Sequence, residues 1–253
     1  MWVVKTSAGS AHDGGAGQRV RGPRGTVELL WGLREPPSRG PKPTLSIGRI
    51  AQAAIDIADA DGLAAVSMQR VADASDVTKM ALYRYLAGKA ELLACMIEQA
   101  VGDPPDLAHL SDTWRPKLQA WARQMWASWD CHPWLPGATT GDRVMGPREL
   151  GWTECAVGAL AGTGLSGRER LDAVFVLSGH IRNTRSLATA GTQPWTTRRQ
   201  LELLRDHGDR FPALMAAVPA AEEASLSGDR AAREFGLARI LDGLGLLIAE
   251  RSG

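Results

Sequence analysis

The chain is 253 residues long, which is enough for one large domain or two modest ones. Apolar residues make up 44% and charged residues 23%, so the composition excludes a disordered, collagenous or membrane-embedded chain. The three cysteines (Cys95, Cys131 and Cys155) are widely spaced and odd in number. This argues against a disulfide framework or a zinc cluster, and we expect a cytoplasmic protein. The net charge of +1 gives no global sign of nucleic acid, so such a function must rest on local clusters.

The first 43 residues differ from the rest and are predicted to be a basic, Pro/Gly-rich extension. Residues 1–27 lack apolar periodicity and are expected to be disordered. Residues 28–34 are expected to form one helical turn or two. Residues 35–43 contain four prolines and are predicted to be a linker or an extended arm.

Residues 44–102 are predicted to form a small helical domain. Four short helices are expected, each next to a residue that caps or breaks a helix: one from Ser46 to Gly62, then 68–75 after Ser67, 79–85 after Thr78 and 89–102 after Gly88. The first of them has an apolar face with three- and four-residue spacing, made of Ile47, Ile50, Ala51, Ala54, Ile57 and Ala58.

Residues 103–253 are predicted to form a larger helical domain. Its first helix places Trp114, Leu118, Trp121, Met125 and Trp129 on one narrow face, and Pro133 and Pro136 are expected to end it. Further helices are predicted over 147–161, 168–190, 196–206, 212–218 and 229–250. No alternating strand pattern is present, so the sequence predicts an all-α fold with an N-terminal three-helix, helix-turn-helix domain and a larger C-terminal domain.

Residues 67–89 carry the motif with the clearest chemistry. Two short capped helices are separated by the tight turn Asp76-Val77-Thr78, an arrangement typical of a helix-turn-helix whose second helix enters the DNA major groove. The second helix and its flank carry Lys79, Arg84 and Lys89 without an acidic residue between 77 and 90. Both tyrosines of the chain, Tyr83 and Tyr85, also lie there, and tyrosine hydroxyls reach phosphate oxygens well.

This stretch resembles the DNA-binding domain of the TetR family of transcriptional regulators. The matching positions, in order, are Gly62, Ser67, Val71-Ala72, Val77-Thr78, Leu82-Tyr83, Tyr85-Leu86, Lys89 and Leu92-Leu93. The chain departs from the family pattern at Asp76, where Gly is usual, and at Ser75, where a hydrophobic residue is usual. The resemblance covers about residues 28–251. Within the family, the chain looks most like an actinobacterial-like subgroup with a tetracycline-repressor-like C-terminal domain.

The resemblance implies DNA-binding roles by position. Tyr83, Tyr85 and Lys89 are expected to contact phosphates, and Ser67, Met68 and Thr78 to lie near the DNA backbone. Gln69, Lys79, Met80 and Ala81 are expected to face base edges, where Gln pairs with adenine, Lys with guanine, and Met or Ala with a thymine methyl group. Arg39 and Lys42, beside Gly and Pro, could form an arm in the minor groove, or a solvated linker.

The C-terminal helices are expected to hold a pocket for a small amphipathic effector. The candidate lining residues are Trp121, Met125, Trp129, Trp152, Cys155, Leu177, Ser178, His180 and Ile181. The alternative for each of them is an ordinary core position. The five histidines lack ligand spacing on a single helix, so no metal, no cofactor and no catalytic residue is expected.

The sequence thus predicts a ligand-responsive DNA-binding regulator, most simply a homodimeric repressor that a small-molecule effector releases from a palindromic operator. The helix over 229–250 is apolar around much of its circumference and is expected to join the dimer interface. A second reading is a helical interaction protein that has lost specific DNA binding. A third is an all-α enzyme that uses the C-terminal cavity, but no acid–base or nucleophile pair is visible for it.

Overall fold

The computed structural model describes residues 23–33, 45–190, 202, 206–217 and 228–252. The described residues contain helices and no strand, as the sequence predicts. The α-helices are α1 (Pro23–Leu30), α2 (Ile47–Asp61), α3 (Met68–Ala74), α4 (Lys79–Tyr83), α5 (Lys89–Ala100), α6 (Trp114–Cys131), α7 (Leu135–Ala138), α8 (Pro147–Ala159), α9 (Gly167–Ala190) and α12 (Gly228–Ser252). The short 3-10 helices are η1 (Leu63–Ala65) and η3 (Gly208–Arg210).

The small domain is built on α2, which begins and ends where its caps predict. The hydroxyl oxygen of Ser46 accepts a hydrogen bond from the backbone N–H of Arg49 over 3.2 Å, and Gly62 takes the positive φ of 82° that ends the helix. The buried face of α2 packs against α3 and α5 and consists of Ile50, Ala51, Ala54, Ile55, Ile57 and Ala58. Each fully buried isoleucine stabilises the domain by about 1.5–3 kcal/mol.

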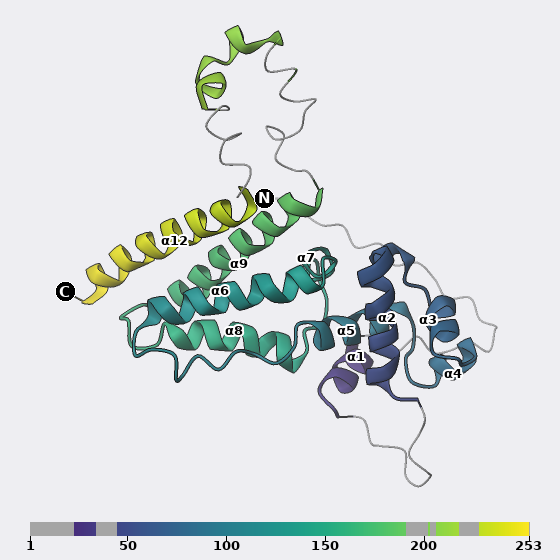
Figure 1. Cartoon of the computed structure of the whole chain (residues 1–253). Coiled ribbons are helices and arrows are strands. Elements are labelled where there is room, and N and C mark those ends of the chain that lie inside the picture. Colours follow the sequence, from purple (N-terminus) through teal and green to yellow (C-terminus); the bar gives the residue numbers. More distant parts are fainter. Residues whose placement is uncertain (1–22, 34–44, 191–201, 203–205, 218–227, 253) are drawn as a thin grey trace, which may run out of the picture.

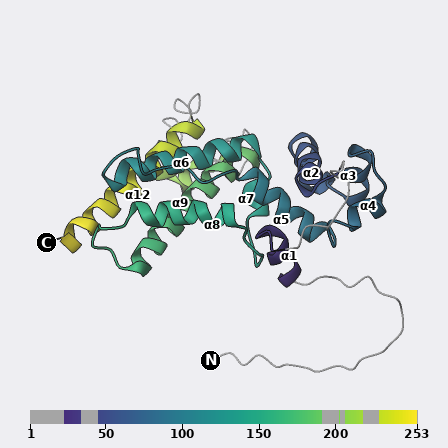
Figure 2. The same cartoon turned by 90° about the horizontal axis from the view of Figure 1, so that it is seen from below.

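The larger domain is a bundle of α6, α8, α9 and α12, and α5 leads into it from the small domain (Figures 1 and 2). Helix α6 contacts the three other helices of the bundle, and α12 packs along α9. Two tryptophans of α6, Trp121 and Trp126, are buried with their indole N–H groups paired. Trp121 donates to the carbonyl oxygen of Trp152 over 2.8 Å, and Trp126 donates to the hydroxyl of Thr184 over 3.2 Å. Buried indole rings therefore fix the register between α6 and its neighbours.

Two helices differ from the prediction. Helix α1 begins at Pro23, so the expectation of disorder is wrong for residues 23–27, whereas residues 1–22 lie outside the described part of the chain. Leu29 and Leu30 of α1 pack against the core, which is why a short helix without a strong sequence signal forms there. Helix α7 was not expected, because prolines were taken only as helix-ending residues. Pro136 sits in its first turn, where a missing N–H costs nothing.

Other predicted elements agree apart from their ends. Helices α3 and α4 end one and two residues earlier than predicted, and α5 and α8 each end two residues earlier. Most of the predicted helix 196–206 lies outside the described residues, and residues 212–217 are helical. None of the helices that the structure describes has the length and hydropathy that a membrane span requires.

Candidate nucleic-acid interface and small-molecule cavity

The turn between α3 and α4 has helix-turn-helix geometry although it lacks glycine. Asp76 adopts a φ of 52°, the left-handed conformation that a short polar residue tolerates better than most. The N–H of Val77 donates to the carbonyl of Ala72 over 3.0 Å, which closes the turn onto α3. The hydroxyl of Thr78 then caps α4 by accepting from the N–H of Ala81 over 3.3 Å. The departure from the family pattern at position 76 therefore leaves the turn intact.

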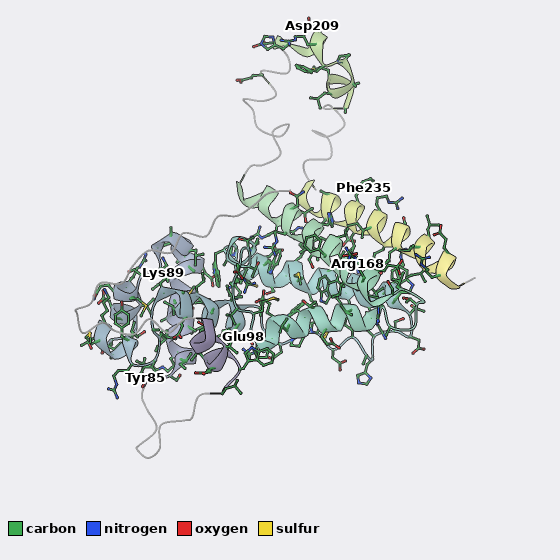
Figure 3. All side chains as sticks on the ribbon, turned by 180° about the vertical axis from the view of Figure 1, so that it is seen from behind. Tyr85, Lys89, Glu98, Arg168, Asp209 and Phe235 are labelled. Carbon is green, nitrogen blue, oxygen red and sulfur yellow. The ribbon has the colours of Figure 1, made fainter. Side chains whose placement is uncertain are left out.

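One exposed face of α3 and α4 presents residues suited to DNA. Lys79 and Met80 are exposed on α4, with Met80 at 69%, and Gln69 is exposed on α3. The side-chain amide of Gln69 donates to the carboxylate of Asp73 over 2.8 Å. Lys89 is exposed at the first position of α5, and Figure 3 shows Tyr85 and Lys89 at the end of the molecule away from α12.

The structure changes the expected role of several positions on this face. Met68 is only 7% exposed, so its side chain belongs to the core and not to the exposed face. Tyr83 and Tyr85 are half-buried and pack against the core, which leaves only part of each side chain accessible. The hydroxyl of Ser67 caps α3 by accepting from the N–H of Arg70 over 3.2 Å.

Two arginines lie beside this face; Arg84 belongs to the basic cluster identified in the sequence, whereas Arg70 was not singled out. Arg84 and Arg70 are both exposed, and Arg70 forms an ion pair with Asp61. Charge alone was the available signal for them. Arg39 and Lys42, the proposed minor-groove arm, lie outside the described residues.

A cavity of about 350 Å³ opens between α6, α8, α9 and the segment after α7. It is lined by Val101, Trp121, Met125, Ser128, Trp129, Thr139, Gly141, Arg143, Met145, Glu149, Trp152, Thr153, Phe175, Ser178 and Arg182. Its size falls within the range of small-molecule sites, about 300–1,000 Å³. A second hollow of about 420 Å³ lies between α2 and the turn at Asp76, but polar and apolar groups share its lining about equally and no aromatic side chain lines it. The aromatic cavity is therefore the better candidate for an effector.

Five of the nine predicted pocket residues line this cavity, namely Trp121, Met125, Trp129, Trp152 and Ser178. The other four do not. Leu177 and Ile181 are core residues, because they lie on the buried side of α9. His180 faces α12, where its Nε2 lies 2.9 Å from the carbonyl oxygen of Arg233 and its ring packs edge-on against Trp126. The thiol of Cys155 donates to the carbonyl of Pro105 over 3.3 Å, and burial raises its pKa.

The polar part of the cavity was missed from the sequence. Arg143 and Glu149 form a bidentate ion pair, in which Nη1 donates to Oε2 over 2.8 Å and Nη2 donates to Oε1. Arg182 donates to the hydroxyl of Thr139 over 2.8 Å and to the carbonyl of Pro136, and its guanidinium lies 5.2 Å from the ring centre of Trp129. Burial lowers the pKa of Arg182, and the charge of Arg143 lowers it further. Only the Phe175, Ser178, Arg182 spacing on α9 was a usable signal, since Arg143 lies in a loop without periodicity.

Two contacts tie the cavity walls to other elements. Glu98 on α5 accepts hydrogen bonds from the backbone N–H groups of Arg148, at 2.7 Å, and Glu149, at 3.5 Å, and so caps α8. Figure 3 labels Glu98 where α5 meets the bundle. The indole N–H of Trp31, just after α1, donates to the carbonyl oxygen of Met145 over 3.3 Å. Helices α1 and α5 are thus both attached to the segment that carries Arg143, Met145 and Glu149.

An apolar surface extends along α9 and α12. Its exposed large side chains are Leu171, Phe175 and Val176 on α9 and Phe235 and Leu246 on α12. A groove between the two helices, about 280 Å³ in volume, is lined mainly by Ala173, Val176, Ile240, Leu244 and Leu247. Exposed apolar patches of this kind mark interaction surfaces.

Two family models match the chain. The model "Bacterial regulatory proteins, tetR family" matches residues 50–96, and "Tetracyclin repressor-like, C-terminal domain" matches residues 107–248. The first range covers the helix-turn-helix domain, and the second covers the bundle with its cavity.

Similar proteins include regulators from Streptomyces species. The chain is 35% identical over 254 residues to the HTH-type transcriptional repressor DrrR1 of Streptomyces coeruleorubidus, covering 97% of this chain and 93% of that one. A crystal structure of a possible TetR family transcriptional regulator from Streptomyces coelicolor A3(2) matches with 28% identity and a TM-score of 0.66, over 80% of this chain and all of that one. ActR from Streptomyces coelicolor, solved in complex with actinorhodin, matches in fold with 23% identity and a TM-score of 0.63, over 79% and 95% of the two chains.

Proposed function

Because the chain belongs to the TetR family of bacterial regulators, we propose that it is a homodimeric repressor that a small-molecule effector releases from operator DNA. The observation that carries the proposal is the pairing, in one chain, of an exposed helix-turn-helix face with an aromatic cavity in the helical bundle. Its site of action would be the cytoplasm, where bacterial DNA lies.

On the DNA side, α4 is the proposed recognition helix. Lys79, Met80 and Ala81 would face base edges in the major groove, together with Gln69 from α3. Lys89 and the accessible parts of Tyr83 and Tyr85 would contact phosphates. Arg39 and Lys42 would supplement them in the adjacent minor groove.

A dimer would bring two such helices to one palindromic operator. Two-fold symmetry would place the two α4 helices in successive major grooves, about one helical turn apart. The apolar surface of α9 and α12 supports this assembly, since it is exposed in a single chain and runs along both helices. The predicted interface helix 229–250 corresponds to α12.

On the effector side, the proposal is supported by the cavity and by the complex of ActR with actinorhodin, which has the same fold. Release from DNA would follow from linkage. An effector that binds more tightly to the conformation unable to fit the operator shifts the population toward it, and its leverage equals that difference in affinity.

A selection of bound sequences from random duplex DNA tests the DNA-binding part. The wild type should enrich a palindrome, and a Lys79→Ala/Lys89→Ala double variant should not. Arg210→Ala is the matched control, because Arg210 is an exposed cation in η3, outside both the helix-turn-helix face and the apolar surface of α9 and α12. If the wild type enriches no sequence at low salt, where phosphate contacts are strongest, the proposal is wrong. The alternative hypothesis, a helical interaction protein that has lost specific DNA binding, then replaces it.

A further inference from the structure

The walls of the bundle cavity are unusually aromatic. Trp121, Trp129 and Trp152 come from α6 and α8, and the exposed ring of Phe175 lies at the side formed by α9. The indole N–H of Trp121 is already occupied by the carbonyl of Trp152, and that of Trp152 lies 3.3 Å from the carbonyl of Gly102. What these two indoles offer a ligand is therefore ring surface rather than a hydrogen bond. Ring surfaces of this kind favour a flat aromatic molecule that stacks on them.

The charged side chains that line the cavity carry a net positive charge. Arg143, Glu149 and Arg182 are the charged residues among those that line it. Glu149 pairs with Arg143, so the guanidinium of Arg182 faces the cavity without a carboxylate partner among the residues that the structure describes. Its hydrogen bonds go to neutral oxygens of Thr139 and Pro136. Burying a cation without a counter-charge is costly, so an anion at this place would be stabilised.

Arg143 carries a hydrogen-bond donor that has no acceptor in the described part of the chain. The Nε–H of Arg143 is buried and has no acceptor among the described residues. The two terminal nitrogens of the same guanidinium are bound by Glu149. A buried donor without an acceptor costs about 1–3 kcal/mol, so this guanidinium would gain from any oxygen that reaches it.

We propose that the effector is a planar aromatic compound with one acidic group, whose rings stack on the tryptophan walls and whose anionic oxygens bind between Arg143 and Arg182. This inference rests on the proposed function for the role of the cavity, and it adds the chemical class of the ligand. A neutral aromatic compound would leave the positive charge unmatched.

The same geometry connects ligand binding to the fold around the cavity. Arg182 holds the turn formed by α7, through the carbonyl of Pro136 and the hydroxyl of Thr139. Both hydrogen bonds come from Nη1, so an anion bound by the same guanidinium acts directly on the side chain that attaches α7 to α9.

The test compares two probes with the same ring system, the anionic anthraquinone-2-carboxylate and the neutral anthraquinone-2-carboxamide. Their affinities for the full chain are measured by quenching of tryptophan fluorescence, since three tryptophans line the cavity. The acid should bind at least about tenfold more tightly than the amide, because a hydrogen bond to a charged group contributes about 1.5–3 kcal/mol. Equal binding of both probes, or binding of neither, would overturn the inference.

A series of charge variants makes the test independent of probe solubility. Arg182→Gln makes the cavity neutral and should bring the acid-to-amide affinity ratio close to one, whereas Glu149→Gln adds a positive charge and should raise the ratio. Arg168→Gln, on an exposed side chain of the same helix, should leave it unchanged. A ratio that is the same in all four proteins contradicts the assignment.

Failure of the proposed function is distinguishable from failure of this inference. The fluorescence titration contains no DNA, so an acid preference can be found in a protein that binds no operator. Conversely, a protein that enriches a palindrome and shows no acid preference keeps the repressor assignment and loses the ligand class.

Discussion

The indole N–H of Trp134 donates to the carboxylate of Asp59 over 2.7 Å, which joins the turn at α7 to the first helix of the DNA-binding domain. His132 reaches the same carboxylate, with its Nδ1 2.9 Å from Oδ2. Asp59 lies on α2, and Trp134 directly precedes α7, which Arg182 holds from the side of the cavity. A continuous path of hydrogen bonds and helix therefore runs from the cavity to α2.

Trp134→Phe should uncouple the two domains without unfolding either, because it removes one N–H and keeps an aromatic ring in place. Coupling between ligand and DNA sites is typically 1–3 kcal/mol, and we expect the variant to lose about half of it. The measurement is operator affinity with and without saturating anthraquinone-2-carboxylate. Trp114→Phe, at the far end of α6, is the control. Full coupling in Trp134→Phe would show that the signal takes another route.

Asp76→Val should destabilise the protein by about 1–2 kcal/mol, because a β-branched residue is strained at a φ of 52°. Asp76→Asn keeps a residue that tolerates this conformation and should unfold at nearly the wild-type denaturant concentration. Urea unfolding followed by circular dichroism compares the three proteins. A stable valine variant would mean that the turn adopts a different backbone conformation in solution.

Lys89→Ala and Gln69→Ala should weaken DNA binding in different ways. Loss of a phosphate contact at Lys89 should lower affinity for all sequences and reduce the slope of log affinity against log salt by about 0.9. Loss of a base contact at Gln69 should change sequence preference and leave the slope unaltered. Titrations of both variants at several salt concentrations, on the operator and on point variants of it, separate these effects. Identical behaviour of the two variants would contradict the assigned roles.

Glu98→Gln should alter the pH dependence of stability. Burial raises the pKa of Glu98, although the N–H groups of Arg148 and Glu149 partly offset this. A raised pKa in the folded state means that the wild type gains stability from this group as pH falls and loses it as pH rises through the folded pKa. The variant lacks this titration. The difference in unfolding free energy, variant minus wild type, should therefore be largest at neutral pH and smallest at acidic pH. Parallel curves between pH 3 and pH 8 would contradict the shift.

The elements that the sequence predicted well depend on local chemistry. Ser46, Ser67 and Thr78 were identified as caps because a hydroxyl before an apolar periodic stretch satisfies the next free N–H groups, and each accepts such a hydrogen bond in the structure. The tolerance of Asp76 for a left-handed turn was predicted on the same local grounds.

The cavity was only partly predictable, because its lining depends on how helices pack. Periodicity placed Ser178, Leu177 and Ile181 together on α9, but only the first of them borders the cavity, while the other two face the core. Arg143 and Glu149 come together across a loop and the start of α8, and no spacing rule links such positions. The early start of α1 was missed because its stability comes from packing on α5 rather than from its own sequence.

Phe175 belongs to two surfaces at once. It lines the cavity, yet it is 79% exposed on the apolar face of α9. In the proposed dimer this ring would be covered by the partner subunit, so the outer wall of the cavity would be complete only after association. The apparent affinity for an effector would then depend on protein concentration by mass action. A dilute and a concentrated sample of the same protein would report different dissociation constants for one compound.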